Sequence, residues 1–147
     1  LRKTGYHEAL LDANLDFQEQ WMAEADFTVG GGYYAAKQML GDPRNKPTAI
    51  FCASDEMGFG AIQAARDLGL RVPQDISVIG LDGHPLGVFY GLSTINQKTK
   101  EQGEHGANWI VDILESGDER ALANIEQLDT WPIDLEVRSS TAVRAKE

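Results

Sequence analysis

The chain has 147 residues, 42% of them hydrophobic, and a formal net charge of −10. This length and composition are typical of one globular domain with a hydrophobic core, and they exclude an intrinsically disordered chain. No apolar run approaches the roughly 18 residues of a membrane span, and no leader peptide is visible. The acidic balance disfavours direct binding of nucleic acid by this chain.

The first forty residues predict two helices with a weak strand between them. Apolar residues recur with helical spacing over Thr4–Ala13 and over Val29–Leu40. Thr28 precedes the second of these helices and is a suitable N-cap. The intervening segment Phe17–Ala23 has a weaker pattern, which we interpret as a strand.

The middle of the chain predicts two stronger strands joined by a helix. Thr48–Ala53 and Ile76–Leu81 are short continuous apolar runs, which are typical of strands buried on both faces of a parallel sheet. The segment Glu56–Leu68 between them has helical spacing, and Gly69 ends it. The single cysteine, Cys52, lies in the first run, where we expect a buried thiol and no internal disulfide.

Beyond residue 100 the pattern predicts an amphipathic helix over Glu101–Glu115 and a short strand over Leu135–Arg138. Strands that alternate with helices of this length indicate an α/β fold, in which helices flank a parallel sheet.

Polar or aromatic residues follow the predicted strands. Asp82 ends one strand between two glycines, Ser54 and Asp55 follow the neighbouring strand, and Phe27 follows the weak one. Ligands of open α/β sheets bind outside the carboxyl ends of the strands. A carboxylate there accepts hydrogen bonds from hydroxyls or ring N–H groups. The alternative, that Asp82 only caps a turn, stays open, and we expect Asp55 to cap its helix.

Other features do not predict a reaction. Gly30–Gly32 could hold a phosphate at a helix start, but the dinucleotide-binding fingerprint has a different spacing. The three histidines lack metal-ligand spacing, and His84 is expected to be an exposed loop residue rather than a specificity element. No nucleophile and base stand near Asp82 in a pattern that a Rossmann-like enzyme would need. The sequence therefore predicts no metal, no cofactor and no enzymatic activity.

The longest motif block, PTAIFCASDEMGFGAIQAARDLGLRVPQDISVIGLDG, resembles the lactose-repressor/purine-repressor family of bacterial transcription regulators. Further stretches fit in the family's order: RKTGYHEAL, DFTVGGGYYAAKQML, LSTINQ and LEVRSST. The resemblance implies a lobe like that of type I periplasmic binding proteins, of which this sequence is a fragment. It assigns residues 1–93 to the C-terminal lobe, 94–126 to a strand and helix of the N-terminal lobe, and 127–147 to a return and tail.

The resemblance also implies site residues for a small-molecule effector. Arg2 falls on a ligand-bonding arginine, Phe27 on an aromatic residue that stacks on the ligand, and Asp82 on the acid that anchors it. Ser54 falls where many members have asparagine, so its side chain is shorter and lacks the amide donor. An aromatic platform with an arginine and an acid favours a sugar over a purine.

The partners implied are the effector, operator DNA through a helix-turn-helix that this chain lacks, and a second copy of the chain. Dimer contacts are expected from residues 28–33, 58–67 and 86–91, with the small residues of the second segment allowing close helix approach. The implied location is the cytoplasm, with no membrane association. The alternative is a secreted sugar-binding protein of a transport system, which has the same lobes and no DNA-binding head.

In the resembled fold, a central strand lies between the strands predicted at Phe17–Ala23 and Thr48–Ala53, and it precedes Leu1. We therefore expect a gap between these two segments, because unpaired strand edges invite pairing with another segment. Thr94–Leu114 is expected to pack irregularly or against a partner for the same reason.

Overall fold

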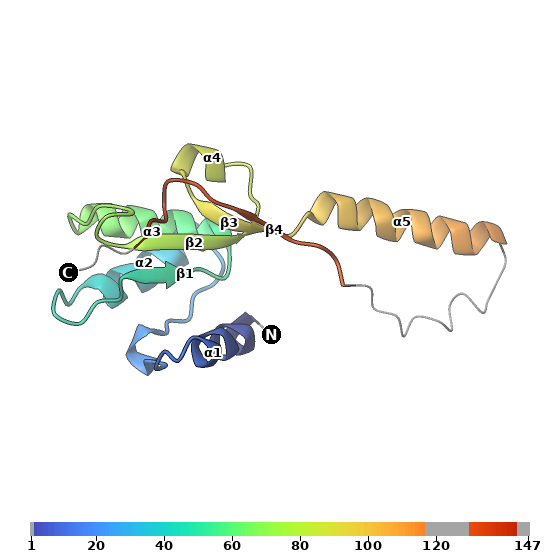
Figure 1. Cartoon of the computed structure of the whole chain (residues 1–147). Coiled ribbons are helices and arrows are strands. Elements are labelled where there is room, and N and C mark those ends of the chain that lie inside the picture. Colours follow the sequence, from blue (N-terminus) through green and yellow to red (C-terminus); the bar gives the residue numbers. More distant parts are fainter. Residues whose placement is uncertain (1, 117–129, 144–147) are drawn as a thin grey trace.

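The structure, a computed structural model, describes residues 2–116 and 130–143 (Figure 1). Predictions that fall on residues 1, 117–129 and 144–147 lie outside the described residues. In chain order the elements are α1 (Arg2–Asp12), the 3-10 turn η1 (Glu19–Trp21), α2 (Val29–Leu40), β1 (Ala49–Phe51), α3 (Asp55–Asp67), β2 (Ser77–Asp82), α4 (Gly87–Tyr90), β3 (Ser93–Asn96), α5 (Thr99–Ser116) and β4 (Asp134–Glu136).

The described strands form one sheet in the order β1-β2-β3-β4. Strand β1 pairs with β2 in parallel, with Ile50 opposite Val78, and β2 pairs with β3 in parallel, with Ile79 opposite Ser93. This confirms the predicted parallel α/β arrangement. The last strand is antiparallel to β3, so the sheet is mixed at that edge.

Helices α2 and α3 begin and end where local chemistry allows. Thr28 Oγ1 accepts the Gly31 N–H at 2.9 Å, and Ser54 Oγ accepts the Met57 N–H at 3.2 Å, so both residues are N-caps. Gly69 follows α3 with a φ of +74°, a conformation that glycine adopts without strain. The apolar side chains of both helices and of the strands form the core, which contains Leu40, Ile50, Phe59, Ile62, Ile76 and Val78.

Two glycines let α2 and α3 cross closely. A Cβ on Gly32 would overlap the backbone of Met57, and a Cβ on Gly60 would overlap the Val29 carbonyl. The small residues therefore serve a contact within the chain. Within the expected dimer segment 58–67, Phe59 and Ala61 are 2% and 1% exposed and belong to the core, so the expectation is wrong for their side chains. For the rest of that segment it stays a prediction.

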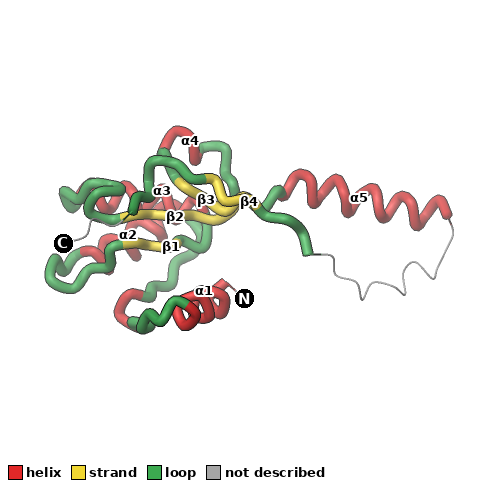
Figure 2. Tube along the Cα trace, viewed as in Figure 1, coloured by secondary structure: helices red, strands yellow, loops and turns green. Residues whose placement is uncertain are grey.

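The predicted strand over Phe17–Ala23 is wrong. Glu19–Trp21 forms a 3-10 turn, and residues 22–26 continue as a loop (Figure 2). A strand requires a hydrogen-bonded neighbour, and among the described residues no strand pairs with this segment.

A cavity of about 800 Å³ separates this segment from β1. It is lined by α1, by residues of the 15–27 segment, and by the free edge of β1 with the residues that flank it, including Tyr6, Met22, Ile50 and Cys52. Thr48 and Cys52 bond to β2, through Ser77 N and Ile79 O, so the alternate residues Ala49 and Phe51 direct their backbone groups toward the cavity. The expected gap is present, and the identity of what fills it stays a prediction.

The segment after residue 93 divides into two parts. Strand β3 pairs with β2, so residues 93–96 belong to the sheet, and the expected boundary at residue 94 falls inside a strand. The expectation of irregular packing is therefore wrong for these residues. Helix α5 instead projects away from the sheet and has no buried residue (Figure 1).

The free edge of β1 has a measurable consequence. In the 147-residue chain, the Ala49 and Phe51 amides should exchange with solvent far faster than the Cys52 amide, which donates to Ile79 O at 2.8 Å. Residue-resolved hydrogen exchange by NMR measures the difference. Equal protection of the three amides would show that the edge is paired.

The two N-caps predict matched losses of stability. Ser54→Ala and Thr28→Ala each remove one side-chain acceptor from a helix N-terminus, so each should lower the free energy of unfolding by about 1 kcal/mol. Denaturant titration of the two variants measures these losses. A neutral Ser54→Ala variant would contradict its assignment as a cap.

Candidate functional site

Arg2, Phe27 and Asp82 meet at the carboxyl ends of the strands, although they are far apart in sequence. The Arg2 guanidinium lies 3.9 Å from Asp82 Oδ1, and its Cζ is 5.9 Å from the centre of the Phe27 ring. One guanidinium nitrogen also donates to the Ala53 carbonyl at 2.6 Å, at the end of β1. The side chains of Arg2 and Asp82 are 39% and 38% exposed, so solvent screens this ion pair and its role is positional.

The Asp82 carboxylate faces the ends of the neighbouring strands. Oδ1 accepts from Gln97 Nε2 at 2.8 Å, and Oδ2 accepts the Asp55 N–H at 3.4 Å. The next amide in the turn, Gly83 N–H, donates instead to Thr94 Oγ1 at 3.2 Å. These partners disfavour the interpretation of Asp82 as a turn cap. Its own φ of +151° is rare for a residue with a side chain, and such backbone positions cluster at ligand sites.

Ser54, and not Asp55 as expected, is the N-cap of α3. The Ser54 side chain is the N-cap of α3 and the residue is 5% exposed, which leaves its contact with a ligand a prediction. Asp55 is not the cap. It is fully buried, and its carboxylate accepts the His84 N–H and the Thr94 hydroxyl, each at 2.6 Å.

His84 is built into the structure. Its ring packs edge-on against Phe59, with the centroids 5.6 Å apart, and its Nδ1 accepts the Leu86 N–H at 3.1 Å. The ring therefore supports the start of α4, which disfavours both a freely exposed loop histidine and a specificity element.

Sequence reasoning missed Gln97 as a partner of Asp82. Gln97 follows β3, whose carboxyl end lies at the same edge as that of β2. The rule that placed Asp82 at this edge would also have placed Gln97 there, had the end of β3 been searched. Asp55 had no such signal, because a helix N-terminus offers an acid a sufficient reason to be present.

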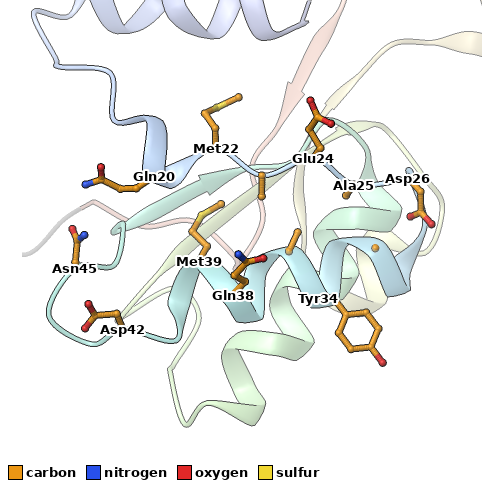
Figure 3. Close-up of a pocket in the computed structure, with 13 residues that line it drawn as sticks. Gln20, Met22, Glu24, Ala25, Asp26, Tyr34, Gln38, Met39, Asp42 and Asn45 are labelled. Carbon is orange, nitrogen blue, oxygen red and sulfur yellow. The ribbon is translucent and has the colours of Figure 1, made fainter.

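Two hollows flank the segment 22–26. The 800 Å³ cavity beside β1 includes Arg2 and Phe27 in its lining, but neither Ser54 nor Asp82. A second hollow of about 910 Å³ lies on the other side, over α2, and Figure 3 shows its labelled side chains, among them Glu24, Asp26 and Asp42. None of the predicted site residues lines the second hollow.

Two titratable groups that line these hollows have shifted pKa values. Burial, with a smaller contribution from the charge of Asp55, raises the pKa of Cys52 to about 12, so its thiol stays protonated and weakly nucleophilic. Hydrogen bonds from the Thr28 hydroxyl and N–H lower the pKa of Asp26, which keeps it ionised beside α2. Within residues 2–116 and 130–143, no cluster of acidic, histidine or cysteine side chains could hold a metal, and no helix has the length and apolarity to cross a membrane.

Comparison with known proteins identifies the family of this chain. The profile described as "Periplasmic binding protein-like domain" matches residues 1–141. The helix-turn-helix-type transcriptional repressor PurR of Erwinia tasmaniensis is 37% identical over 140 residues, which are 94% of this chain and 40% of that protein. PurR of Yersinia enterocolitica is 42% identical over 117 residues, 78% of this chain and 34% of that protein. The chain thus spans two fifths or less of these relatives.

Solved structures agree with the sequence relatives. The lac repressor dimer bound to operator and the anti-inducer ONPF is 28% identical with a TM-score of 0.79, and the match covers 97% of this chain and 47% of that one. The CelR–cellobiose complex is 30% identical with a TM-score of 0.73, covering 95% and 41%. A LacI-family regulator from Enterococcus faecium with bound ribose is 25% identical with a TM-score of 0.79, covering 96% and 51%. The chain belongs to the family of periplasmic-binding-protein-like domains, in the form found in regulators of the LacI/PurR type.

Proposed function

We propose that this chain is the effector-binding and dimerisation lobe of a LacI/PurR-type transcription regulator. The observation that carries the proposal is the convergence of Arg2, Phe27 and Asp82 at one edge of the sheet. The edge is the carboxyl end of parallel strands, where open α/β sheets bind ligands.

Each of the three side chains offers a different interaction. The Phe27 ring is 54% exposed and provides a flat apolar face for a sugar or nucleobase ring. The Arg2 guanidinium provides donors in a fixed fork, and Asp82 accepts hydrogen bonds from paired hydroxyls or ring N–H groups. Gln97 holds Asp82 Oδ1 in place, so the acceptor is oriented before the effector arrives.

The effector class proposed is a sugar, with a purine as the alternative. A ring stacked on Phe27 with polar edges toward Arg2 and Asp82 fits a pyranose or furanose, whose hydroxyls lie around the ring. The solved structures support a sugar, since the CelR structure contains cellobiose and the Enterococcus regulator contains ribose. The name PurR of the curated relatives keeps a purine as the alternative.

The remaining partners follow the relatives. We propose that a regulator carrying this lobe binds operator DNA through a separate helix-turn-helix and works in the cytoplasm, as a repressor does. A secreted sugar-binding protein is not favoured, because the curated relatives reported above are repressors. For the same reason an enzymatic role is not favoured.

The first test of the proposal removes the anchor. In the complete regulator, Asp82→Ala should abolish effector binding and the effector's influence on operator binding, while operator binding without effector persists. Calorimetry with ribose, cellobiose, adenine and hypoxanthine measures the binding, and a gel-shift titration measures operator affinity.

The control for this test is Asp112→Ala, which removes an exposed carboxylate on α5, away from the site. It should leave both measurements unchanged. Unchanged binding of a probe by Asp82→Ala would contradict the proposed site. If the variant loses both operator binding and its folded structure, the role of Asp82 is structural.

Dimerisation is proposed to use the surface of α4. Leu86, Val88 and Phe89 are 46%, 65% and 83% exposed and lie within the single turn of α4 and its N-cap. Apolar residues gathered in this way mark interaction surfaces, and a standard interface buries about 1,600 Å² in total. A second copy of the chain is the proposed occupant.

The α4 surface predicts a charge-sensitive dimer. Phe89→Glu should shift the regulator toward monomer by placing a carboxylate in a buried interface, whereas Val143→Glu, at a residue 97% exposed, should have no effect. Sedimentation velocity across a concentration series measures both. A Phe89→Glu variant that dimerises as the wild type does would place the interface elsewhere.

A further inference from the structure

Asp55 is the one fully buried carboxylate among the described residues, and it holds the end of β2 from both sides. Its backbone N–H donates to Asp82 Oδ2 at 3.4 Å, and its carboxylate accepts the His84 N–H at 2.6 Å. Residues 82 and 84 flank Gly83, so one residue fixes the positions on either side of the turn.

The other carboxylate oxygen of Asp55 is hydrogen-bonded to a residue of β3. Oδ1 accepts the hydroxyl proton of Thr94 at 2.6 Å, and Thr94 Oγ1 in turn accepts the Gly83 N–H at 3.2 Å. Thr94 is fully buried, and a Cβ on Gly80 would overlap Asp55 Oδ1. The surroundings are thus shaped to admit this carboxylate and to satisfy it with hydrogen bonds, which burial of a charge requires.

The path continues from His84 to α4. The His84 carbonyl accepts the Gly87 N–H at 2.8 Å, and its Nδ1 accepts the Leu86 N–H at 3.1 Å. Phe59 packs edge-on against the His84 ring and stacks on Tyr90 at a centroid distance of 4.3 Å. His84 therefore bonds the start of α4 directly and is linked to Tyr90, at its end, through the Phe59 ring.

We propose that Asp55 is a positioning residue that couples Asp82 to the α4 surface. An effector that draws on Asp82 Oδ2 competes with the Asp55 N–H, whose bond at 3.4 Å is the longest of the set. A shift at this bond moves the carboxylate on the same residue, and with it His84 and α4. The inference rests on the proposed function for its effector and its dimer, but the coupling itself is a property of this chain.

The test is a double-mutant cycle that needs no effector. In the complete regulator, Asp82→Ala should raise the amide exchange rate of segment 84–91 at least fivefold, the lower bound of common allosteric couplings. Asp55→Asn should do the same. If Asp55 carries the coupling, the double variant should exchange no faster than Asp55→Asn alone. Hydrogen-exchange mass spectrometry measures the rates, with α2 as the internal reference for global stability.

Asp55→Asn is chosen because it keeps the size of the side chain. Its carbonyl can still accept the His84 N–H and its amide can donate to Thr94 Oγ1, so the fold is retained while the Thr94 hydroxyl loses its acceptor. Thr94→Val is the second variant, which breaks the link between Asp55 and Thr94 from the side of β3. Thr94→Ser keeps the hydroxyl and should exchange at the wild-type rate. These variants separate a coupling role from simple loss of stability, which would raise exchange in α2 as well.

Two outcomes would overturn the coupling: effects of Asp82→Ala and Asp55→Asn that multiply in the double variant, or unchanged exchange of segment 84–91 in Asp82→Ala. Neither outcome depends on effector identity. If calorimetry finds no binding of the sugar and purine probes while the cycle shows coupling, the proposed effector site fails and the coupling stands. If instead Asp82→Ala abolishes probe binding while the two substitutions act independently in the cycle, the proposed effector site stands and the coupling fails.

Discussion

The parallel pairing of β1 with β2 is the constraint on which the rest of this structure depends. Because both strands run in the same direction, with Ile50 opposite Val78, their carboxyl ends emerge at one edge of the sheet. That edge receives Ser54 and Asp55 from the first strand and Asp82 from the second. An antiparallel pairing would have sent these residues to opposite ends. The parallel pairing therefore brings the Asp55 N–H within hydrogen-bond distance of Asp82, whether or not a ligand binds there.

The packing of α2 on α3 holds this edge in register. Gly32 and Gly60 allow the two backbones to approach within the space that a Cβ would fill, and the buried side chains of α3, among them Phe59 and Ile62, fill the core beneath the sheet. Because the N-terminus of α3 starts directly after β1, its close packing fixes where Ser54 and Asp55 lie. Substitution of either glycine would move α3 and, with it, the backbone N–H that Asp82 accepts. The glycines thus act on the site without touching it.

The sequence predicted those parts of the fold that local signals determine. Thr28 as an N-cap, Gly69 as a helix stop and the two apolar strands all depend on neighbouring residues, and the structure confirms them. The prediction of a strand over Phe17–Ala23 was wrong because a strand requires a hydrogen-bonded neighbour, and the described residues supply none for this segment. Asp55 was misassigned for a related reason: its burial results from Thr94, 39 positions away, and a pattern read along the chain cannot show that contact. Among the site residues, Asp82 and Phe27 were placed by the rule on strand ends and Arg2 by family resemblance, and the structure brings the three together.

Helix α5, in the second half of the chain, also requires a packing partner. Trp109, Ile110, Val111 and Leu114 are 43%, 55%, 48% and 76% exposed, and the described part of the chain buries none of the helix. Helices of this length owe most of their stability in proteins to an apolar face that packs, so the face on α5 implies a surface that covers it. The free edge of β1 and the cavity beside it imply a second missing contact of a different kind, because backbone groups there require hydrogen bonds and not apolar cover. The two contacts lie at different places, since α5 projects beyond the carboxyl ends of the strands, whereas the free edge runs along the side of β1 (Figure 1). The places that need a partner are therefore the free side of β1 and the apolar face of α5. The proposed effector site adjoins both, because Arg2 lines the cavity beside β1 and Gln97, which bonds Asp82, stands just before α5.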